Sequence, residues 1–216
     1  DASHELRTPL SVLKMELDLA LARARTPEEL EVALRNASEE TDRLVRLAQD
    51  LLVLARMEKD RVPVKRRDVS MADLVRDSVH DYAERARVAG IGIEVDVEPG
   101  AVSLDPARVR QAVENLLDNA LRYAGHGGVI TLRSMRVGGA VRISVEDSGP
   151  GFPPEMLDRA FEPFARSATE VDGNGSRPGA GLGLAIVRAV AEAHGGTAAA
   201  ENLPTGGTRV TLLLRP

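Results

Sequence analysis

The sequence contains no cysteine and no tryptophan, and its 216 residues include only two tyrosines and three phenylalanines. Without cysteine the chain has neither disulfides nor cysteine-ligated metal sites. Because aromatic residues are so scarce, its core must be built from Leu, Val, Ile and Ala. The chain also lacks an apolar run of about 20 residues and a signal-peptide pattern, so it has no evident membrane span or leader. We expect no membrane contact by this stretch.

The balance of charge excludes a further class of partner. The formal net charge is −5, whereas proteins that bind the phosphate backbone usually present a basic face, so we expect no nucleic-acid partner. A hydrophobic content of 43% and a charged content of 28% are ordinary for a folded domain. The length allows one large domain or two small ones. The chain begins without Met and in mid-pattern, and we expect it to be a piece of a longer protein.

Residues 1–61 are predicted to form two long helices. Leucines in the first helix recur at spacings of four and three, which places them in one apolar stripe: Leu6, Leu10, Leu13, Leu17 and Leu21. Thr26-Pro27 then reads as the cap and first position of a second helix, whose stripe runs from Leu30 to Leu54. A two-helix hairpin has little core of its own. We therefore expect a homodimer in which two hairpins form a four-helix bundle.

The first turns of this hairpin gather polar groups around His4. Thr8 lies one turn after His4, and Glu5 is near Thr8, so all three project from neighbouring positions of the helix. Pro9 removes a backbone hydrogen bond and predicts a bend beside them. From these residues alone, His4 is either a nucleophile or a solvated surface histidine.

A short basic segment containing a proline, residues 62–69, reads as a linker that leads into a strand and marks the boundary of a second domain, residues 70–216. Ser70 and Gly90 bound a helix. Alternating runs predict strands, and Gly138-Gly139 joins two of them in a hairpin. The predicted strands are residues 91–97, 129–137, 140–146, 196–202 and 208–214; further helices are predicted over residues 105–124 and 182–194. We predict an α+β fold, in which this second domain is an α/β sandwich whose mainly antiparallel sheet is covered by helices on one face.

The helix over residues 109–124 carries the first candidate site. Asn115 and Asn119 lie one turn apart on one face, so two amide oxygens point the same way. Neutral oxygens that act together with phosphate oxygens suit Mg²⁺. Arg122 offers a phosphate partner and Tyr123 a ring for stacking. The alternative is that both asparagines simply hydrogen-bond within the domain.

Two glycine-rich segments form the second candidate site. Asp147 ends a strand and is followed by Gly149 and Gly151; a carboxylate there could accept from an exocyclic amine, although such turns are also common in hairpins. Residues 165–178 read as a mobile loop of functional interest. That loop ends in Gly179-Ala180-Gly181-Leu182-Gly183-Leu184, whose glycines leave the amides of the next helix open to a phosphate. Each part alone also fits an ordinary turn.

Taken in order, these motifs resemble a known family. The runs SHELRTPL, ENLLDNALRYA, DSGPGF, FEPF, GAGLGLAI and TGGT resemble the catalytic core of bacterial sensor histidine kinases of two-component systems. The resemblance covers nearly the whole chain. It implies a dimerisation and histidine-phosphotransfer hairpin followed by an ATP-binding domain of the type shared with DNA gyrase and heat-shock chaperones.

The resemblance also implies roles for individual residues. His4 is then the phosphoacceptor, Glu5 assists it, and Thr8 matches a position that helps water remove phosphate from the partner. Asn119 matches the Mg²⁺ ligand, with Asn115 beside it. The other residues implied to border the ATP are Arg122, Tyr123, Asp147, Gly149, Gly151, Gly179, Gly181, Gly183 and Leu184, with Asp147 reading the adenine amine.

The resemblance has departures and leaves alternatives open. Arg122 stands where relatives often carry Lys, and Ala124 where they carry Thr or Ser. The implied activity is autophosphorylation of His4 by ATP with Mg²⁺, followed by transfer to an aspartate on the receiver domain of a response regulator. The rivals are an enzyme that acts mainly as a phosphatase of that regulator and a dimeric scaffold with a vestigial nucleotide site. The resemblance also implies the cytoplasmic portion of a membrane-bound sensor.

Overall fold

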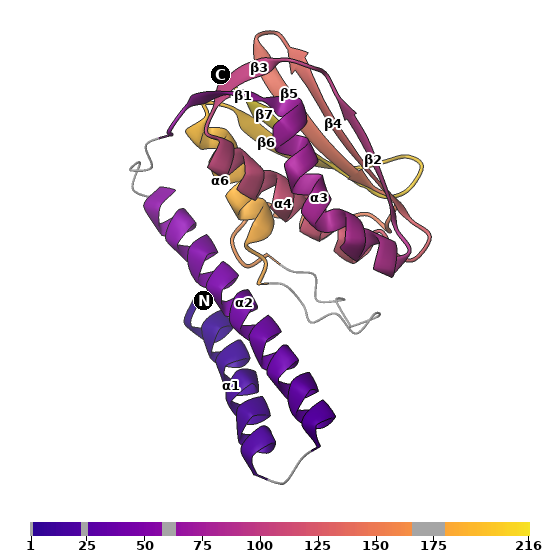
Figure 1. Cartoon of the computed structure of the whole chain (residues 1–216). Helices are drawn as coiled ribbons and strands as arrows, with labels where there is room; N and C mark the ends of the chain where they lie inside the picture. Colours follow the sequence, from indigo (N-terminus) through magenta and orange to yellow (C-terminus); the bar gives the residue numbers. More distant parts are fainter. Residues whose placement is uncertain (1, 23–25, 58–63, 166–179) are drawn as a thin grey trace. The chain divides into compact units, whose positions relative to one another are not determined.

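The computed structural model describes residues 2–22, 26–57, 64–165 and 180–216, without the side chains of residues 2–5, 43, 56 and 57. The chain divides into two compact units, Asp1–Ala55 and Arg56–Pro216. Figure 1 shows the helices of the first unit and the mixed helices and strands of the second. Among the described helices, none combines the length and the apolar character that crossing a membrane requires.

The first unit is the predicted helical hairpin. Helix α1 spans Ala2–Leu21 without interruption at Pro9, and α2 spans Pro27–Met57. The amide of Glu29 donates to Thr26 Oγ1 at 3.3 Å, and the amide of Thr26 donates to Glu29 Oε2 at 3.2 Å. This reciprocal pair is a capping box, and it fixes where α2 begins.

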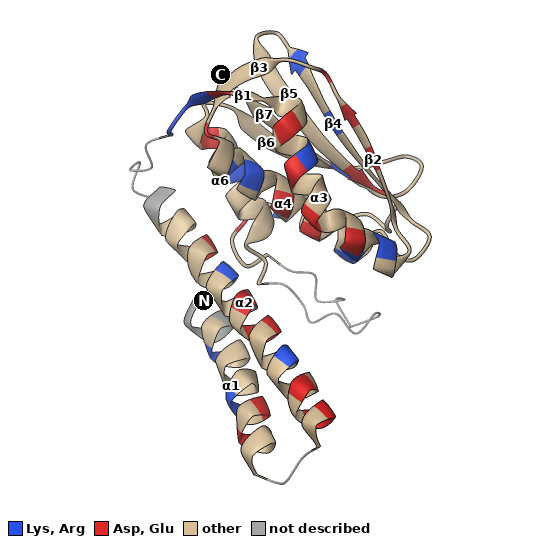
Figure 2. Ribbon diagram, in the orientation of Figure 1, with Lys and Arg blue, Asp and Glu red and all other residues tan. Residues whose placement is uncertain are grey.

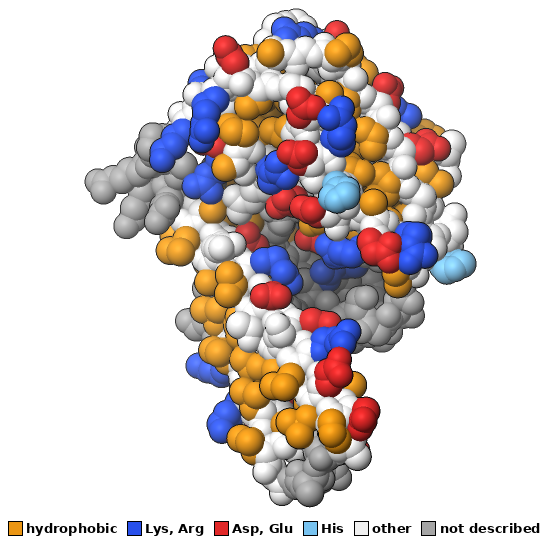
Figure 3. All heavy atoms as spheres, in the orientation of Figure 1, with side chains coloured by type: hydrophobic (Ala, Val, Ile, Leu, Met, Phe, Trp, Pro, Cys, Tyr) orange, Lys and Arg blue, Asp and Glu red, His pale blue; other side chains and the backbone are white. Residues whose placement is uncertain are grey.

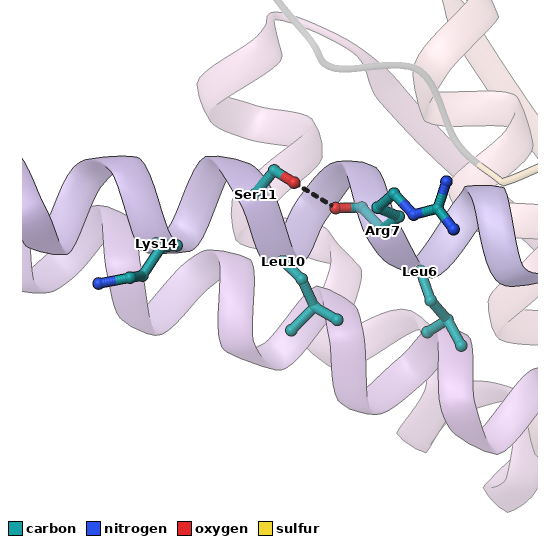
Figure 4. Close-up of a pocket in the computed structure, with 5 residues that line it drawn as sticks. All are labelled: Leu6, Arg7, Leu10, Ser11 and Lys14. Atoms are coloured by element: carbon teal, nitrogen blue, oxygen red, sulfur yellow. Dashed lines mark hydrogen bonds between the residues drawn. The ribbon is translucent and has the colours of Figure 1, made fainter.

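Much of the predicted apolar stripe stays exposed in a single copy of the hairpin. Leu10 is 53% exposed, Leu17 40% and Leu21 85%. Figure 3 shows the apolar side chains that gather along this unit. Figure 4 shows that Leu6 and Leu10 point to the same side of α1, where they line an open pocket together with Arg7, Ser11 and Lys14. The hairpin therefore presents a large apolar surface that its own two helices do not cover.

The second unit is built on a five-stranded sheet with strand order β2-β4-β5-β7-β6. All neighbours are antiparallel except β2 and β4, which are parallel. Three long helices, α3, α4 and α6, lie on one face of the sheet (Figure 1), and α4 packs between the other two. The predicted fold class is confirmed. The elements of this unit are β1 Arg67–Ser70, α3 Met71–Ala89, β2 Gly92–Val97, β3 Ala101–Leu104, α4 Pro106–Tyr123, β4 Val129–Val137, β5 Ala140–Asp147, α5 Pro154–Leu157, α6 Gly183–Ala193, β6 Thr197–Asn202 and β7 Thr208–Leu214.

Local sequence signals explain most of these bounds. Ser70 caps α3 by accepting from the amide of Asp73 at 3.3 Å, and Gly90 ends the helix in the left-handed conformation at φ 69°. Gly138 and Gly139, both at positive φ, turn β4 into β5. The buried positions of β7 alternate along the strand, which agrees with the predicted period of two, whereas β5 is buried at most of its positions.

Two strands were not predicted at their observed places. Residues 67–69, assigned above to the linker, belong to β1, which pairs with β3 in a separate antiparallel ribbon. Four-residue strands carry too little alternation to be recognised from sequence, so β3 was missed. The strand β2 is also more exposed than a half-buried strand should be, with Val95 at 47%, because it lies at one end of the strand order and pairs with β4 alone.

Candidate functional site

The candidate site lies where α4 passes the start of α6. Asn115 Nδ2 donates to the carbonyl of Gln111 at 3.0 Å, which leaves Asn115 Oδ1 as an acceptor. A Cβ placed on Gly183, the first residue of α6, would lie only 3.1 Å from that oxygen. Asn119, one turn further along α4, is half-buried and forms no side-chain hydrogen bond with the described residues. Asn115 therefore faces the beginning of α6 with acceptor capacity to spare, and Asn119 follows one turn along the same helix.

The start of α6 is built without a side-chain cap. Leu182 occupies the cap position and is buried. The amide of Ile186 donates to the carbonyl of Leu182 at 3.0 Å, and this is the first backbone hydrogen bond of the helix among the described residues. Within the described residues, the earlier amides have no backbone partner, so this helix start can hold an anion.

Gly181 determines the path of the backbone just before α6. Its φ of 71° suits glycine, and a Cβ there would lie 2.9 Å from the carbonyl of Ala165. The amide of Phe164 donates to the carbonyl of Gly181 at 2.9 Å, and Phe164 itself has a positive φ of 64°. The backbone of Phe164 is thus joined to Gly181, two residues before the start of α6.

Asp147, at the end of β5, is buried and held from two sides. Thr208 Oγ1 on β7 donates to Asp147 Oδ2 at 2.6 Å, and the amide of Gly149 donates to Asp147 Oδ1 at 2.8 Å. Each carboxylate oxygen can accept a second hydrogen bond. The carboxylate is therefore rigidly oriented and still able to receive a donor from a ligand.

Close backbone packing joins the Asp147 end of the site to α4. A Cβ on Gly149 would lie 2.4 Å from the carbonyl oxygen of Tyr123, so no side chain fits between this turn and the end of α4. Tyr123 is half-buried, whereas Arg122 is exposed and forms no ion pair among the described residues. One continuous set of contacts thus links Asp147, through Gly149, to the face of α4 that carries the two asparagines.

The other polar side chains of α4 belong to a different surface. Asp118 accepts from Arg85 of α3 at 2.9 Å, and that guanidinium lies 4.7 Å from the ring centre of Tyr82. Tyr82 donates to the carbonyl of Glu114 at 3.2 Å. Burial raises the pKa of the Tyr82 hydroxyl and of the Glu114 carboxyl. Figure 2 shows where the acidic and basic residues lie along the ribbons of α3 and α4. These contacts hold α4 against α3 and leave its asparagine face to the site.

A buried histidine joins the beginning of α4 to the end of α6, away from the candidate site. His194, which follows α6, is 0% exposed. Its Nε2 accepts from the amide of Asp105 at 3.1 Å, and its Nδ1 donates to the carbonyl of Val190 at 2.8 Å. Asp105 in turn caps α4 at Arg108 and accepts from the amide of Lys65 at 2.9 Å. Burial lowers the pKa of His194 because it disfavours the charged ring, and the neutral ring is the form that can accept from Asp105.

The structure brings together only part of the predicted residue set. Asn115, Gly149, Asp147, Tyr123 and Gly183 lie along one connected path, with Asn119, Arg122 and Leu184 on the same two helices; Gly151 follows in the turn after Gly149. Gly179 lies outside the described residues, as do the residues of the predicted loop from 166 onward. His4 and Glu5 lie on α1, but their side chains are not described, and Thr8 is exposed on the same helix.

One contributor was missed when residues were assigned from the sequence. Thr208 fixes the carboxylate of Asp147 across neighbouring strands, yet no role was given to it. The signal was present in the run Thr205-Gly206-Gly207-Thr208. A Cβ on Gly207 would lie 1.9 Å from the carbonyl oxygen of Asp147, so this turn and Asp147 are in direct contact.

Comparison with known proteins agrees with this arrangement. Residues 104–216 match the family described as Histidine kinase-, DNA gyrase B-, and HSP90-like ATPase, and residues 1–60 match the His Kinase A (phospho-acceptor) domain. The two domains follow one another in the order that the motifs predict. The chain belongs to the bacterial sensor histidine kinases and corresponds to their catalytic core.

Individual relatives show how much of such proteins the chain represents. It is 39% identical over 208 residues to a probable sensor histidine kinase, TcrY, of Mycobacterium tuberculosis, covering 94% of this chain and 42% of TcrY. Across the first curated relatives, the chain spans 36% to 44% of their length. Among solved structures, Acinetobacter baumannii histidine kinase AdeS is 27% identical with a TM-score of 0.81, covering 98% of this chain and 97% of that one. Full-length ShkA in complex with AMPPNP is 31% identical with a TM-score of 0.73, over 98% of this chain and 44% of that one.

Proposed function

We propose that the chain binds ATP in its second unit, transfers the γ-phosphoryl group to His4, and passes it on to an aspartate of a response-regulator receiver domain. The observation that carries the proposal is the buried carboxylate of Asp147, which Thr208 and Gly149 orient and which keeps acceptor capacity. The adenine amine is a donor that fits this acceptor. The likeness to ShkA, which was solved with AMPPNP, supports a nucleotide as the ligand.

The same path of residues offers groups for the rest of the nucleotide. The amides at the start of α6 suit a phosphate, and Gly183 lets that helix approach Asn115 closely. Arg122, exposed at the end of α4, supplies a cation for phosphate oxygens. The half-buried Tyr123 is adjacent to the Gly149 turn, where a base can stack against its ring.

The described residues fit a magnesium ion that is shared with the nucleotide. They contain no group of three or more His, Asp or Glu side chains that would hold a metal ion. Asn115 Oδ1 lies beside the start of α6, and Asn119 follows one turn along α4. Both amides offer neutral oxygen ligands, and Mg²⁺ takes few protein ligands when phosphates and water complete its shell. When bound, the ion would neutralise charge on the β- and γ-phosphates.

For the phosphoryl transfer, a neutral His4 imidazole attacks the γ-phosphorus in line, its nitrogen forms the new bond, and ADP leaves. A histidine with an ordinary pKa near 6.5 is mostly neutral at pH 7. Glu5 would accept a hydrogen bond from the imidazole or take its proton. Thr8 would orient water in the reverse, phosphatase direction.

The exposed apolar surface of the hairpin supports a homodimer through residues 1–61. Leu10, Leu17 and Leu21 of the predicted stripe are all exposed in one copy, and burying them against a second hairpin would contribute roughly 1.5 to 3 kcal/mol for each fully buried leucine. A four-helix bundle buries such stripes on all four helices.

The test is labelling of the purified chain with γ-labelled Mg-ATP, in the wild type and in His4→Gln. We expect an acid-labile, base-stable adduct in the wild type and none in His4→Gln, with ATP affinity unchanged in the variant. His80→Gln, which changes an exposed histidine on α3, is the matched control and should label normally. Normal labelling of His4→Gln would refute the phosphoacceptor assignment, and an unlabelled wild type would favour the phosphatase or scaffold alternatives.

A further inference from the structure

Asn202, the last residue of β6, forms hydrogen bonds to the backbone of Phe152 with both the oxygen and the nitrogen of its side-chain amide. The amide of Phe152 donates to Asn202 Oδ1 at 2.8 Å, and Asn202 Nδ2 donates to the carbonyl of Phe152 at 2.8 Å. The two residues are 50 positions apart in the chain. The side chain thus pairs with Phe152 as a neighbouring strand would.

This pair completes the anchoring of the turn that follows Asp147. At the start of the turn, the amide of Gly149 donates to Asp147 Oδ1 at 2.8 Å. The hydroxyl of Ser148 accepts from the amide of Val129, the first residue of β4, at 2.9 Å. At the other end, Phe152 is held by Asn202. The turn is therefore attached by hydrogen bonds to β4, β5 and β6, at both of its ends.

Gly151 packs directly against the same amide. A Cβ on Gly151 would lie 3.0 Å from Asn202 Oδ1, and its φ of 84° suits glycine. The backbone of this turn is thus shaped around Asn202 as well as held by it. Asn202 is exposed, so its two hydrogen bonds add little to global stability and act mainly on the local order of the turn.

We infer that Asn202 is a positioning residue of the nucleotide site, which holds the Gly149 to Gly151 turn in its binding conformation through Phe152. The inference rests on the proposed ATP-binding function. If the turn is ordered before the ligand arrives, binding does not have to supply the cost of ordering it. Removing the two hydrogen bonds between Asn202 and Phe152 therefore weakens binding of the adenosine part of the nucleotide, and the effect is the same for ATP and ADP.

The experiment compares ATP and ADP affinity in the wild type, Asn202→Ala and Glu201→Gln. The control alters the neighbouring residue, whose carboxylate pairs with Arg209 at 3.0 Å and does not touch the turn. For Asn202→Ala we expect about five- to tenfold weaker binding of both nucleotides, the lower end of the range for two net hydrogen bonds, because these two are exposed to solvent. Autophosphorylation at saturating ATP should stay within about twofold of the wild type, and hydrogen exchange of the Phe152 amide should speed up.

The combined results for affinity, rate and stability distinguish a positioning role of Asn202 from a general structural role. A merely structural residue would lower the unfolding midpoint and the maximal rate, whereas a positioning residue raises KM and leaves both nearly unchanged. Unaltered affinity in Asn202→Ala, while the wild type binds ATP, would overturn the inference and leave the proposed function standing. A wild type that does not bind ATP would overturn both. If Asn202→Ala does not fold, Asn202→Asp decides in the same way, because it keeps the acceptor for the Phe152 amide and loses the donor.

Discussion

Replacing His194 by glutamine is expected to remove an acid-dependent loss of stability from the second unit. His194 is fully buried, and its Nε2 must be unprotonated to accept the Asp105 amide at 3.1 Å. The charged groups that act on the ring are the Asp105 carboxylate, which favours the protonated form, and the Arg66 guanidinium, which disfavours it. Burial is the largest influence and acts in the same direction as Arg66; together they outweigh Asp105 and the hydrogen bond to the Val190 carbonyl, so the pKa of His194 is lowered in the folded state.

The sign and the size follow from proton linkage. Below the unfolded-state pKa of about 6.5, the unfolded chain takes up a proton that the folded chain excludes, so stability falls as the pH falls from about 6.5 toward the lowered folded pKa. Between pH 7.5 and 5.5 this one group can cost at most about 1.4 kcal/mol, because each unit of pH between the two pKa values corresponds to about 1.36 kcal/mol. Above pH 7.5 its contribution is constant.

Tyrosine fluorescence during urea unfolding measures this stability selectively. The chain has no tryptophan, and Tyr82 and Tyr123 both belong to the second unit. Glutamine at position 194 can donate to the Val190 carbonyl and accept from Asp105 without titrating. The wild type should therefore lose more stability than His194→Gln between pH 7.5 and 5.5, by at most about 1.4 kcal/mol, while His80→Gln, at an exposed position, should follow the wild type. Equal losses in the wild type and His194→Gln would refute the reasoning.

Two further predictions concern the candidate site. Gly207→Ala should destabilise the second unit by about 3 kcal/mol or more in the same unfolding assay, because its Cβ would lie 1.9 Å from a backbone carbonyl of β5. Gly206→Ala, with a similar φ of 90° and no atom within 4 Å, should lose only the 1 to 2 kcal/mol or so of a left-handed residue; equal losses would contradict the close packing. Asn119→Ala should reduce the gain in ATP affinity on adding Mg²⁺ by about tenfold, the scale of one polar contact to a charged group. An unchanged magnesium dependence in calorimetric titration would remove Asn119 from the metal site.

The sequence by itself determined the features that depend on near neighbours in the chain. Ser70 and Gly90 bound α3, Asp105 begins α4, and Gly138-Gly139 closes the β4-β5 hairpin, each as predicted. These signals work because caps and tight turns involve residues within about four positions of one another. The order of the motifs also determined the family, which the matched domains confirm.

Only the tertiary structure decided which distant residues meet. Thr208 reaches Asp147 across 61 positions, and Asn202 reaches Phe152 across 50. Such contacts depend on strand order and register, and a shift of one residue would turn each side chain to the opposite face of the sheet. Neither the sequence of a four-residue strand nor the presence of one asparagine at a strand end indicates which distant residue will be its partner. The list of candidate residues could thus be read from the sequence, whereas the groups that hold them in place came from the fold.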